Sequence, residues 1–477
     1  MRFSKYFLTI IFLACSILAH AQTDTVLTLQ QCLDIAIKNN LNVKQFDLTM
    51  EQDRIGLKQA KENLLPSITG SASRELSQGR SINPVTNTYL NESLTSDNYG
   101  ITASLTLFNG LALQNAIKQA SYNYQAGKMD FQQAKDQVTI NIITAYLSVL
   151  DAEEILGESK SQLDVAKENV NVSEIKEKDG ANLTASTYSD FKGAYASSLV
   201  GVVQNQNSLD AAKLTLYNLM NVPYNKNAQL QPLNAQDLVG QYGVNSDQVY
   251  NTALQQLAIV KAAIFRREGA EKGVKVAQGQ LLPTLAVNGG ISTNYSSADQ
   301  KSVLIDSTVV PTGAYVNTPG GGKQSVFATE ANTASQNISY ADQFKNNYGT
   351  YVTLGLNIPI FTNHIKKNAV ALAKINLLNE QYIEDNTKIV LKQSVEQAWY
   401  NMNAAYERYK ALKDEVEAYT ESYRVSKIRF DAGVLTSDLF IIAKNNMDGA
   451  NLNLISAKYD YFIYSKILDY YQGKLSI

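Results

Sequence analysis

The sequence predicts a mainly α-helical protein with four β-strands, built from two copies of one structural plan. Three observations support this fold class. Two distant stretches of the chain resemble each other, which indicates an internal repeat. Apolar residues recur at heptad spacing over long segments of each copy, as in coiled coils. Four segments of about ten residues alternate between apolar and polar side chains, as strands with two different faces do.

The internal repeat is a tandem duplication. Ala36–Ile68 aligns with Ala253–Leu285 at an offset of 217 residues, with ten of 33 positions identical. Further along, Phe108 matches Phe361 at an offset of 253. The difference of 36 residues places one much longer loop in the second copy.

The first residues have the features of a secretory signal peptide. Arg2 and Lys5 precede an apolar run, and Ala-His-Ala ends at Ala21. We expect a signal peptide at 1–21, cleaved after Ala21. Lipoprotein processing at Cys15 is the alternative. No later stretch reaches about 18 consecutive apolar residues, so the sequence predicts no transmembrane helix.

The mature chain then divides into three parts. The first structural repeat is expected at 22–221 and the second at 246–477. Pro, Asn and Gly interrupt both periods at 222–245, which predicts a link between the repeats.

Each repeat is predicted to run helix, strand, loop, strand, very long helix, tight turn and helix. In the first repeat a helix extends from about Leu29 to Asn63 and ends before Pro66, since Pro disfavours helix at the preceding residue. The strands follow at 67–76 and 99–108 and, in the second repeat, at 284–295 and 348–360. Polar loops are expected at 77–98 and 296–346.

The longest helices follow the second strand of each repeat. One seam of the first steps by seven residues and is rich in small side chains, which favours close packing of helices: Val138, Ala145, Ala152, Ser159, Ala166 and Ser173. At 1.5 Å per residue, almost 70 residues of helix are roughly 100 Å long. The return helices are expected at 184–220 and 437–471.

The strands allow two interpretations. Their length and alternation suit a membrane β-barrel wall with lipid on one side and water on the other, and aromatic residues lie near their ends: Tyr89, Tyr99, Phe108, Tyr295, Tyr348 and Phe361. Two hairpins capping a soluble helical bundle would show the same alternation. Four strands cannot close a membrane barrel. The membrane interpretation therefore requires eight, twelve or sixteen strands from two, three or four chains.

Composition argues against several classes of function. A net charge of −2 offers no basic surface for nucleic acid. The mature chain keeps one cysteine, Cys32, and one histidine, His364, so we expect no enzyme, no metal site and no cofactor. Gly320–Ser325 differs from a phosphate-binding loop in spacing and context. A secreted soluble coiled-coil adhesin or scaffold remains the alternative function.

The mature chain resembles the TolC family of outer membrane efflux proteins over nearly its whole length. The resemblance is carried by Leu27–Asn40, by the duplicated QAKENLLPSI and VAQGQLLPTL, by the strand ends LTLFNG and NIPIFTN, and by Arg429–Leu439. It implies a homotrimer in outer membrane lipid, with a twelve-stranded barrel continuing into an α-helical periplasmic tube. It also implies a passive exit duct for drug efflux or type I secretion, served by an inner-membrane transporter and a periplasmic adaptor (membrane fusion protein).

The resemblance further implies an adaptor contact at the turns that end the long helices. The residues are Gly180, Asn182, Leu183 and Thr184 in the first repeat and Gly433, Val434, Leu435 and Thr436 in the second. Helix capping alone also favours Gly after a helix and Thr before one. Both interpretations stay open.

The resemblance finally implies a gate near the second turn. In the family an acidic residue six positions after the turn glycine lines the narrowest ring. Here Asp438 stands five positions after Gly433, and Leu439 occupies the sixth. Arg429 could pair with Asp438 or favour the helix C-terminus. Asp438 could equally serve the helix dipole with no role in a pore.

Overall fold

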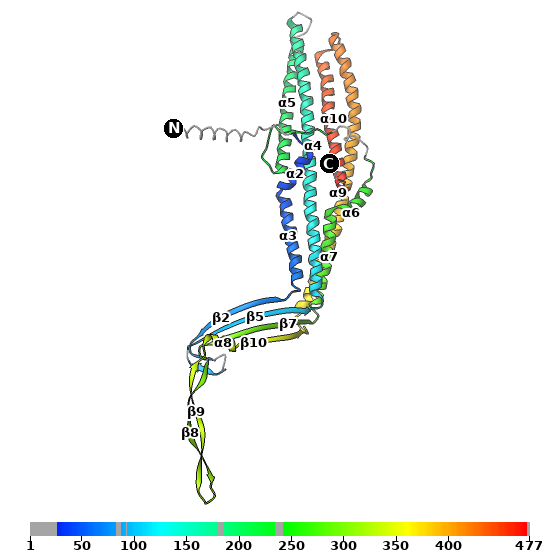
Figure 1. Ribbon diagram of the computed structural model, residues 1–477. Coiled ribbons are helices and arrows are strands. Elements are labelled where there is room, and N and C mark those ends of the chain that lie inside the picture. Colours follow the sequence, from blue (N-terminus) through cyan, green and yellow to red (C-terminus); the bar gives the residue numbers. More distant parts are fainter. Residues whose placement is uncertain (1–25, 83–86, 92, 179–184, 234–241, 475–477) are drawn as a thin grey trace, which may run out of the picture. The chain divides into compact units, whose positions relative to one another are not determined.

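The computed structural model describes residues 26–82, 87–91, 93–178, 185–233 and 242–474, which form two compact units (Figure 1). The helical unit contains the described residues of Met1–Ile55, Ala120–Ala270 and Asn376–Ile477. The β unit contains those of Gly56–Gln119 and Glu271–Ile375. The predicted signal peptide, the turn residues Gly180–Thr184 and part of the predicted link lie outside the described residues.

Helices form most of the first unit. They are α2 (Leu29–Asn39), α3 (Leu41–Glu62), α4 (Ala112–Lys178), α5 (Ala185–Met220), α6 (Ser246–Gln256), α7 (Ala258–Gly279), α9 (Ile365–Asp431) and α10 (Ser437–Tyr471). One end of each of α3, α4, α7 and α9 belongs to the β unit. The two long helices α4 and α9 have 67 residues each, as the heptads predict. In the described part of the chain, no helix combines the length and apolar character needed to cross a membrane.

The single helix predicted at 29–63 is wrong, because the chain leaves the helical conformation at Asn40 (φ −64°, ψ 122°). The Asn40 side chain accepts a hydrogen bond from the Val43 amide at 3.1 Å and so caps α3. Leu257 makes the same break between α6 and α7 (φ −68°, ψ 135°). Asn40 and Leu257 are 217 residues apart, so the break belongs to the duplicated plan.

The buried heptad seam confirms coiled-coil-like packing of α4. All six of its predicted positions, from Val138 to Ser173, are buried. Val138, Ala145 and Ala152 belong to a core shared with α2, α5 and α10, and a second core is formed mainly by α6, α9 and α10. A short parallel pair, β1 (Val26–Leu27) with β6 (Gln229–Leu230), borders the first core. The Tyr146 hydroxyl donates a hydrogen bond to the Gln231 carbonyl at 2.7 Å and ties this pair to α4.

The β unit is built on one antiparallel sheet with strand order β10-β7-β5-β2. Its strands are β2 (Ser67–Ser77), β5 (Leu94–Phe108), β7 (Thr284–Ser296) and β10 (Gly349–Asn357). Each repeat contributes two of them, which confirms the four predicted strands. Strands β2 and β10 are the edges of this sheet.

The two predicted polar loops are wrong, since both contain regular structure. Residues 77–98 include the pair β3 (Arg80–Ile82) and β4 (Tyr89–Asn91) and the first residues of β5. Residues 296–346 form a long hairpin of β8 (Gln300–Asn317) and β9 (Lys323–Asn337), followed by the short helix α8 (Tyr340–Asn346). These strands are exposed on both faces and therefore lack the alternation that marks a half-buried strand.

A turn of two left-handed residues joins a strand to a long helix in each repeat. Gly110 and Leu111 have φ 66° and 63°, and Asn363 and His364, 253 residues later, have φ 49° and 60°. A Cβ at Gly110 would stand 2.3 Å from the carbonyl oxygen of Gly279. The repeats therefore approach backbone to backbone at this junction.

Candidate functional site

The four-stranded sheet has one polar face. Strand register places polar or small residues side by side on it in three successive rows: Ser67, Ser104, Asn288 and Thr353; Thr69, Thr102, Gly290 and Tyr351; and Ser71, Gly100, Ser292 and Gly349. Hydrogen bonds run along the face, with 2.8 Å between the Thr69 and Thr102 hydroxyls and 2.7 Å from Ser104 to the Asn288 side chain. None of these twelve residues carries a charge.

Tyr351 lies across this polar face. A Cβ at Gly290 would meet the Tyr351 ring at 2.8 Å, so the ring covers the place where a larger side chain would stand. Glycine is therefore required at position 290 for the Tyr351 ring to lie on the polar face of the sheet.

The opposite face of the sheet is apolar. The rows between the polar ones contain Ile68, Ala103, Gly289 and Val352; Gly70, Ile101, Ile291 and Thr350; and Leu105, Val287 and Leu354. Ile68, Val352 and Leu354 are 68%, 82% and 64% exposed. A large exposed apolar surface of this kind requires a lipid or protein environment.

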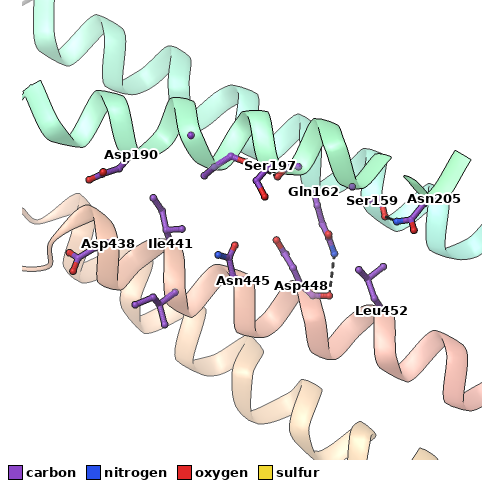
Figure 2. Close-up of a pocket in the computed structure, with 15 residues that line it drawn as sticks. Ser159, Gln162, Asp190, Ser197, Asn205, Asp438, Ile441, Asn445, Asp448 and Leu452 are labelled. Carbon is purple, nitrogen blue, oxygen red and sulfur yellow. Dashed lines mark hydrogen bonds between the residues drawn. The ribbon is translucent and has the colours of Figure 1, made fainter. Parts of the chain in front are cut away.

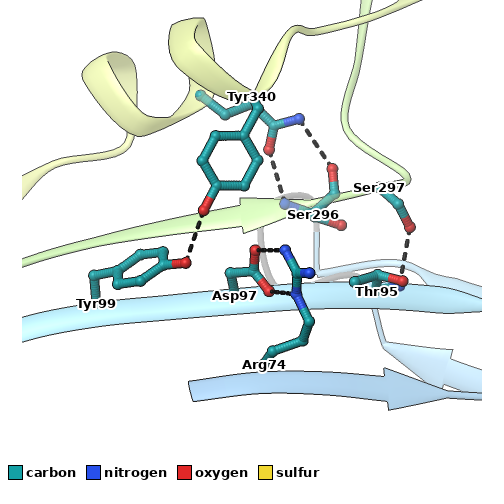
Figure 3. A network of polar contacts seen from close by, with 8 residues as sticks. Arg74, Thr95, Asp97, Tyr99, Ser296, Ser297 and Tyr340 are labelled. Atoms are coloured by element: carbon teal, nitrogen blue, oxygen red, sulfur yellow. Dashed lines mark hydrogen bonds and ion pairs between the residues drawn. The ribbon is translucent and has the colours of Figure 1, made fainter. Parts of the chain in front are cut away.

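Polar contacts fix α8 on the apolar face at one end of the sheet (Figure 3). Arg74 donates two hydrogen bonds of 2.7 Å to the fully buried Asp97. The Tyr340 hydroxyl lies 2.8 Å from that of Tyr99. Gln343 is 1% exposed and binds both backbone groups of Ser296. The aromatic rings at this end of the sheet resemble the girdles of membrane barrels.

In the helical unit, the turn between α9 and α10 is a Schellman motif. The Gly433 amide donates to the Phe430 carbonyl at 3.0 Å, and the Val434 amide donates to the Arg429 carbonyl at 2.9 Å. Gly433 has φ 71°, which explains the glycine. Val434 is 69% exposed, and Leu435 is half-buried.

Four aromatic rings stabilise the helices behind this turn. Phe440 stacks on Phe430 at 4.8 Å, and Phe191 of α5 meets both rings edge-on at 6.0 and 5.5 Å. Tyr423 lies 5.6 Å from Phe440. The cluster joins α5 to the α9–α10 pair with specific ring geometry.

A groove of about 640 Å³ runs between α4, α5 and α10 (Figure 2). Small residues of α5 form one wall, among them Gly193, Ser197 and Gly201. Figure 2 shows Asp190 and Asp438 on opposite sides of its end. Asp190 accepts a hydrogen bond of 2.8 Å from Ser437.

One lining residue of the groove, Asp448, belongs to a buried ion pair. Lys444 and Asp448 pair within α10, with side chains 8% and 13% exposed. Burial raises the pKa of Asp448, because the charged form is separated from water. Gln162 of α4 donates to the Asp448 backbone carbonyl at 3.3 Å and links the two walls.

Asp438 lies in the first turn of α10 and is exposed. Hydrogen bonds from the Thr436 side chain and from the Leu439 amide lower the pKa of Asp438 and keep its carboxyl ionised. The ion pairs among the described residues do not include one between Asp438 and Arg429. Asp438 therefore places a negative charge in the first turn of α10, where it favours the helix dipole, and it also borders the groove.

The sequence profile of the family described as "Outer membrane efflux protein" matches residues 32–222 and 249–469. The chain belongs to this family. The outer membrane efflux protein BepC of Brucella suis biovar 1 (strain 1330) is 22% identical over 451 residues, which are 94% of this chain and 86% of BepC.

Solved structures of outer membrane proteins share the fold of this family member. The CmeC channel of Campylobacter jejuni has a TM-score of 0.72 at 18% identity, covering 94% of this chain and 86% of CmeC. VceC of Vibrio cholerae has a TM-score of 0.74 at 14% identity, covering 93% and 96% of the two chains. The open state of MtrE from Neisseria gonorrhoeae has a TM-score of 0.71 at 17% identity, covering 94% and 89%. The resemblance to the TolC family is thereby confirmed.

Sequence reasoning missed three features of this outer membrane efflux protein. Asp190 and the groove depend on helices that are distant in sequence. The ring cluster had a signal, because Phe191, Phe430 and Phe440 flank the two turns. The rows of the polar face follow from register, which alternation alone does not fix.

Proposed function

We propose that the protein is the outer membrane exit duct of a tripartite efflux or type I secretion system, and that it acts as a homotrimer. The two-faced sheet carries this proposal. Its apolar face suits lipid, its polar face suits water, and its edges β2 and β10 are available to the next chain. Three copies would supply twelve strands, which suffice to close a barrel. The helical unit then extends into the periplasm.

Transport through this duct is passive in our proposal, so an inner-membrane transporter supplies the energy and a periplasmic adaptor connects the two. Family membership argues against a soluble adhesin or scaffold and against an enzyme. The signal peptide, cleaved after Ala21, supplies the export route.

The test is purification in detergent followed by single-channel recording in a planar bilayer. We expect a heat-modifiable trimer that inserts and conducts ions. A water-soluble monomer that never inserts would contradict the proposal and favour the scaffold alternative.

The adaptor is proposed to bind the two turns, Gly180, Asn182, Leu183 and Thr184 with Gly433, Val434, Leu435 and Thr436. In the second turn the exposed Val434 supports this, since an apolar side chain at a helix tip offers contact area without a structural need. Replacing Leu183 and Leu435 with Asp should abolish efflux and leave the trimer and its conductance intact. Normal drug resistance in this double variant would contradict the contact.

The gate is proposed at Asp438, with Arg429 one turn before Gly433 as a candidate partner in the assembled trimer. Three converging carboxylates would bind cations, because like charges meet where water is scarce. A trivalent cation added from the periplasmic side should block the channel, and the Asp438→Ala variant should escape the block. Asp190→Ala is the matched variant across the groove. Block that is lost only in Asp190→Ala would place the constriction on α5.

A further inference from the structure

The hairpin β8–β9 lies outside the four-stranded sheet, and its stability needs an explanation. It occupies Gln300–Asn337 in the connection between β7 and β10, and its two strands pair with each other (Figure 1). Nearly every residue in both strands is exposed. An isolated two-stranded ribbon is marginally stable in water. A hairpin of this length therefore calls for a further surface that packs against it.

The two faces of the hairpin differ in chemistry. Val309 pairs with Thr329 and Pro311 pairs with Phe327, which places these four side chains on one face. On the other face Thr308 pairs with Glu330, and Asp306 pairs with Asn332. We call the first the apolar face of the hairpin, defined by Ser307, Val309, Pro311, Phe327, Thr329 and Ala331. These six residues carry no charge, whereas both acidic residues of the hairpin lie on the other face, together with the Val310–Ala328 pair. Lys323, nearer the tip of the hairpin, lies on the same side as Phe327.

Side-chain packing, rather than edge-to-edge strand pairing, is the interaction open to this hairpin. Pro311 has no amide hydrogen, and the register shifts between Leu304 and Asp306 and between Pro311 and Tyr315. These interruptions prevent a continuous row of hydrogen bonds to another strand. Val309 and Phe327 are 65% and 59% exposed, so the apolar face still has surface to bury.

A second copy of the same hairpin is the occupant that the molecule favours. The hairpin leads into β10, the edge strand that meets a neighbouring chain in the proposed trimer. The whole hairpin has two basic and two acidic residues, Lys301, Lys323, Asp306 and Glu330, so net charge does not oppose self-association. Around a threefold axis the same face of each copy can point toward the axis, so an uncharged face brings no like charges together there.

We propose that the apolar faces of the three hairpins pack against one another at the outer end of the barrel and form a trimeric collar. This inference rests on the proposed trimer. It adds an interface that the four-stranded sheet does not require, so the two can be tested separately.

The test is disulfide cross-linking of Val309→Cys, with Thr308→Cys as the matched control on the other face. The background suits it, because Cys32 is the sole cysteine of the mature chain, is 0% exposed, and burial raises the pKa of its thiol to about 11. Mild oxidation of the purified trimer should convert Val309→Cys into covalent dimers, up to two chains in three. Thr308→Cys should form several-fold fewer.

The outcomes separate the two proposals. A trimer without Val309→Cys cross-links, or with equal cross-linking in both variants, overturns the collar and leaves the duct intact. A protein that forms no trimer overturns both. Deletion of 300–337 provides a second measurement, since the collar requires that the shortened trimer dissociate at a lower temperature, and an unchanged dissociation temperature contradicts it.

Discussion

Asp151 on α4 is a half-buried carboxyl with a strongly raised pKa. Burial first, and then the negative charges of Asp460 and Glu154, raise the pKa of Asp151 to about 6, while Lys458 opposes the shift. One of its carboxylate oxygens is buried without a hydrogen-bond partner among the described residues. An unfolded Asp has a pKa of about 3.9, so folding raises this pKa.

This pKa has a definite consequence for stability. Well below pH 4, Asp151 is protonated in both states and does not change the free energy of unfolding. As pH rises from about 4 to about 6 the unfolded state loses its proton first, and the folded state becomes less stable. We expect Asp151→Asn to raise the free energy of unfolding by about 1 kcal/mol above pH 7, a figure reduced for partial solvent screening. Thermal melts of the detergent-solubilised protein at pH 4.5 and 7.5 would measure it.

The control for Asp151→Asn is Asp164→Asn, an exposed carboxyl of the same helix. It should change stability little at either pH. A gain from Asp151→Asn that is equal at pH 4.5 and 7.5 would contradict the raised pKa and indicate a packing effect instead.

At the scale of helices and strands, two glycines should respond oppositely to replacement by alanine. Gly110→Ala forces a Cβ to 2.3 Å from the Gly279 carbonyl at a residue with φ 66°. We expect it to destabilise the fold by roughly 2–4 kcal/mol. Gly157 lies inside α4 with nothing within 4 Å of a Cβ, so Gly157→Ala should stabilise by about 0.5–1 kcal/mol. The denaturant midpoint of each variant would measure this. If both midpoints shift in the same direction, the opposite roles of Gly110 and Gly157 are wrong.

The elements also show how far sequence could predict the fold. The seam from Val138 to Ser173 is buried as the heptads indicate, because a helix face in a core keeps its period. The break at Asn40 was masked because the apolar residues continue on both sides of it, although Asn is a favoured residue at a helix start. Asp190 could not be placed beside Ser437, because 247 residues separate them and only tertiary packing brings them together.

At the scale of the whole molecule, adjacent residues of one strand should respond oppositely to the same change. Ile291 lies on the apolar face of β7 and Ser292 on the polar face. A charge facing lipid costs about 2–4 kcal/mol near the bilayer midplane, whereas a charge facing water costs little. We expect Ile291→Asp to prevent membrane assembly, and Ser292→Asp to assemble and shift the channel toward cation selectivity.

Heat-modifiable migration and reversal potentials in a salt gradient would test this pair. The opposite pattern, with Ser292→Asp failing to assemble, would mean that the Ser292 face contacts lipid and the Ile291 face contacts water. Equal behaviour of the two variants would mean that the strand does not separate two environments.

Tyr351 resting on Gly290, within a surface of hydroxyls and amides, bears on how long a solute remains inside the proposed barrel. Such a surface offers donors and acceptors to any solute but no fixed charge to hold an ion. Rapid conduction requires sites weak enough to leave as well as to enter. The residence time of a solute inside the proposed barrel should therefore be short and similar for cations, anions and neutral molecules. The time that a solute spends in the duct would then be set near Asp190 and Asp438.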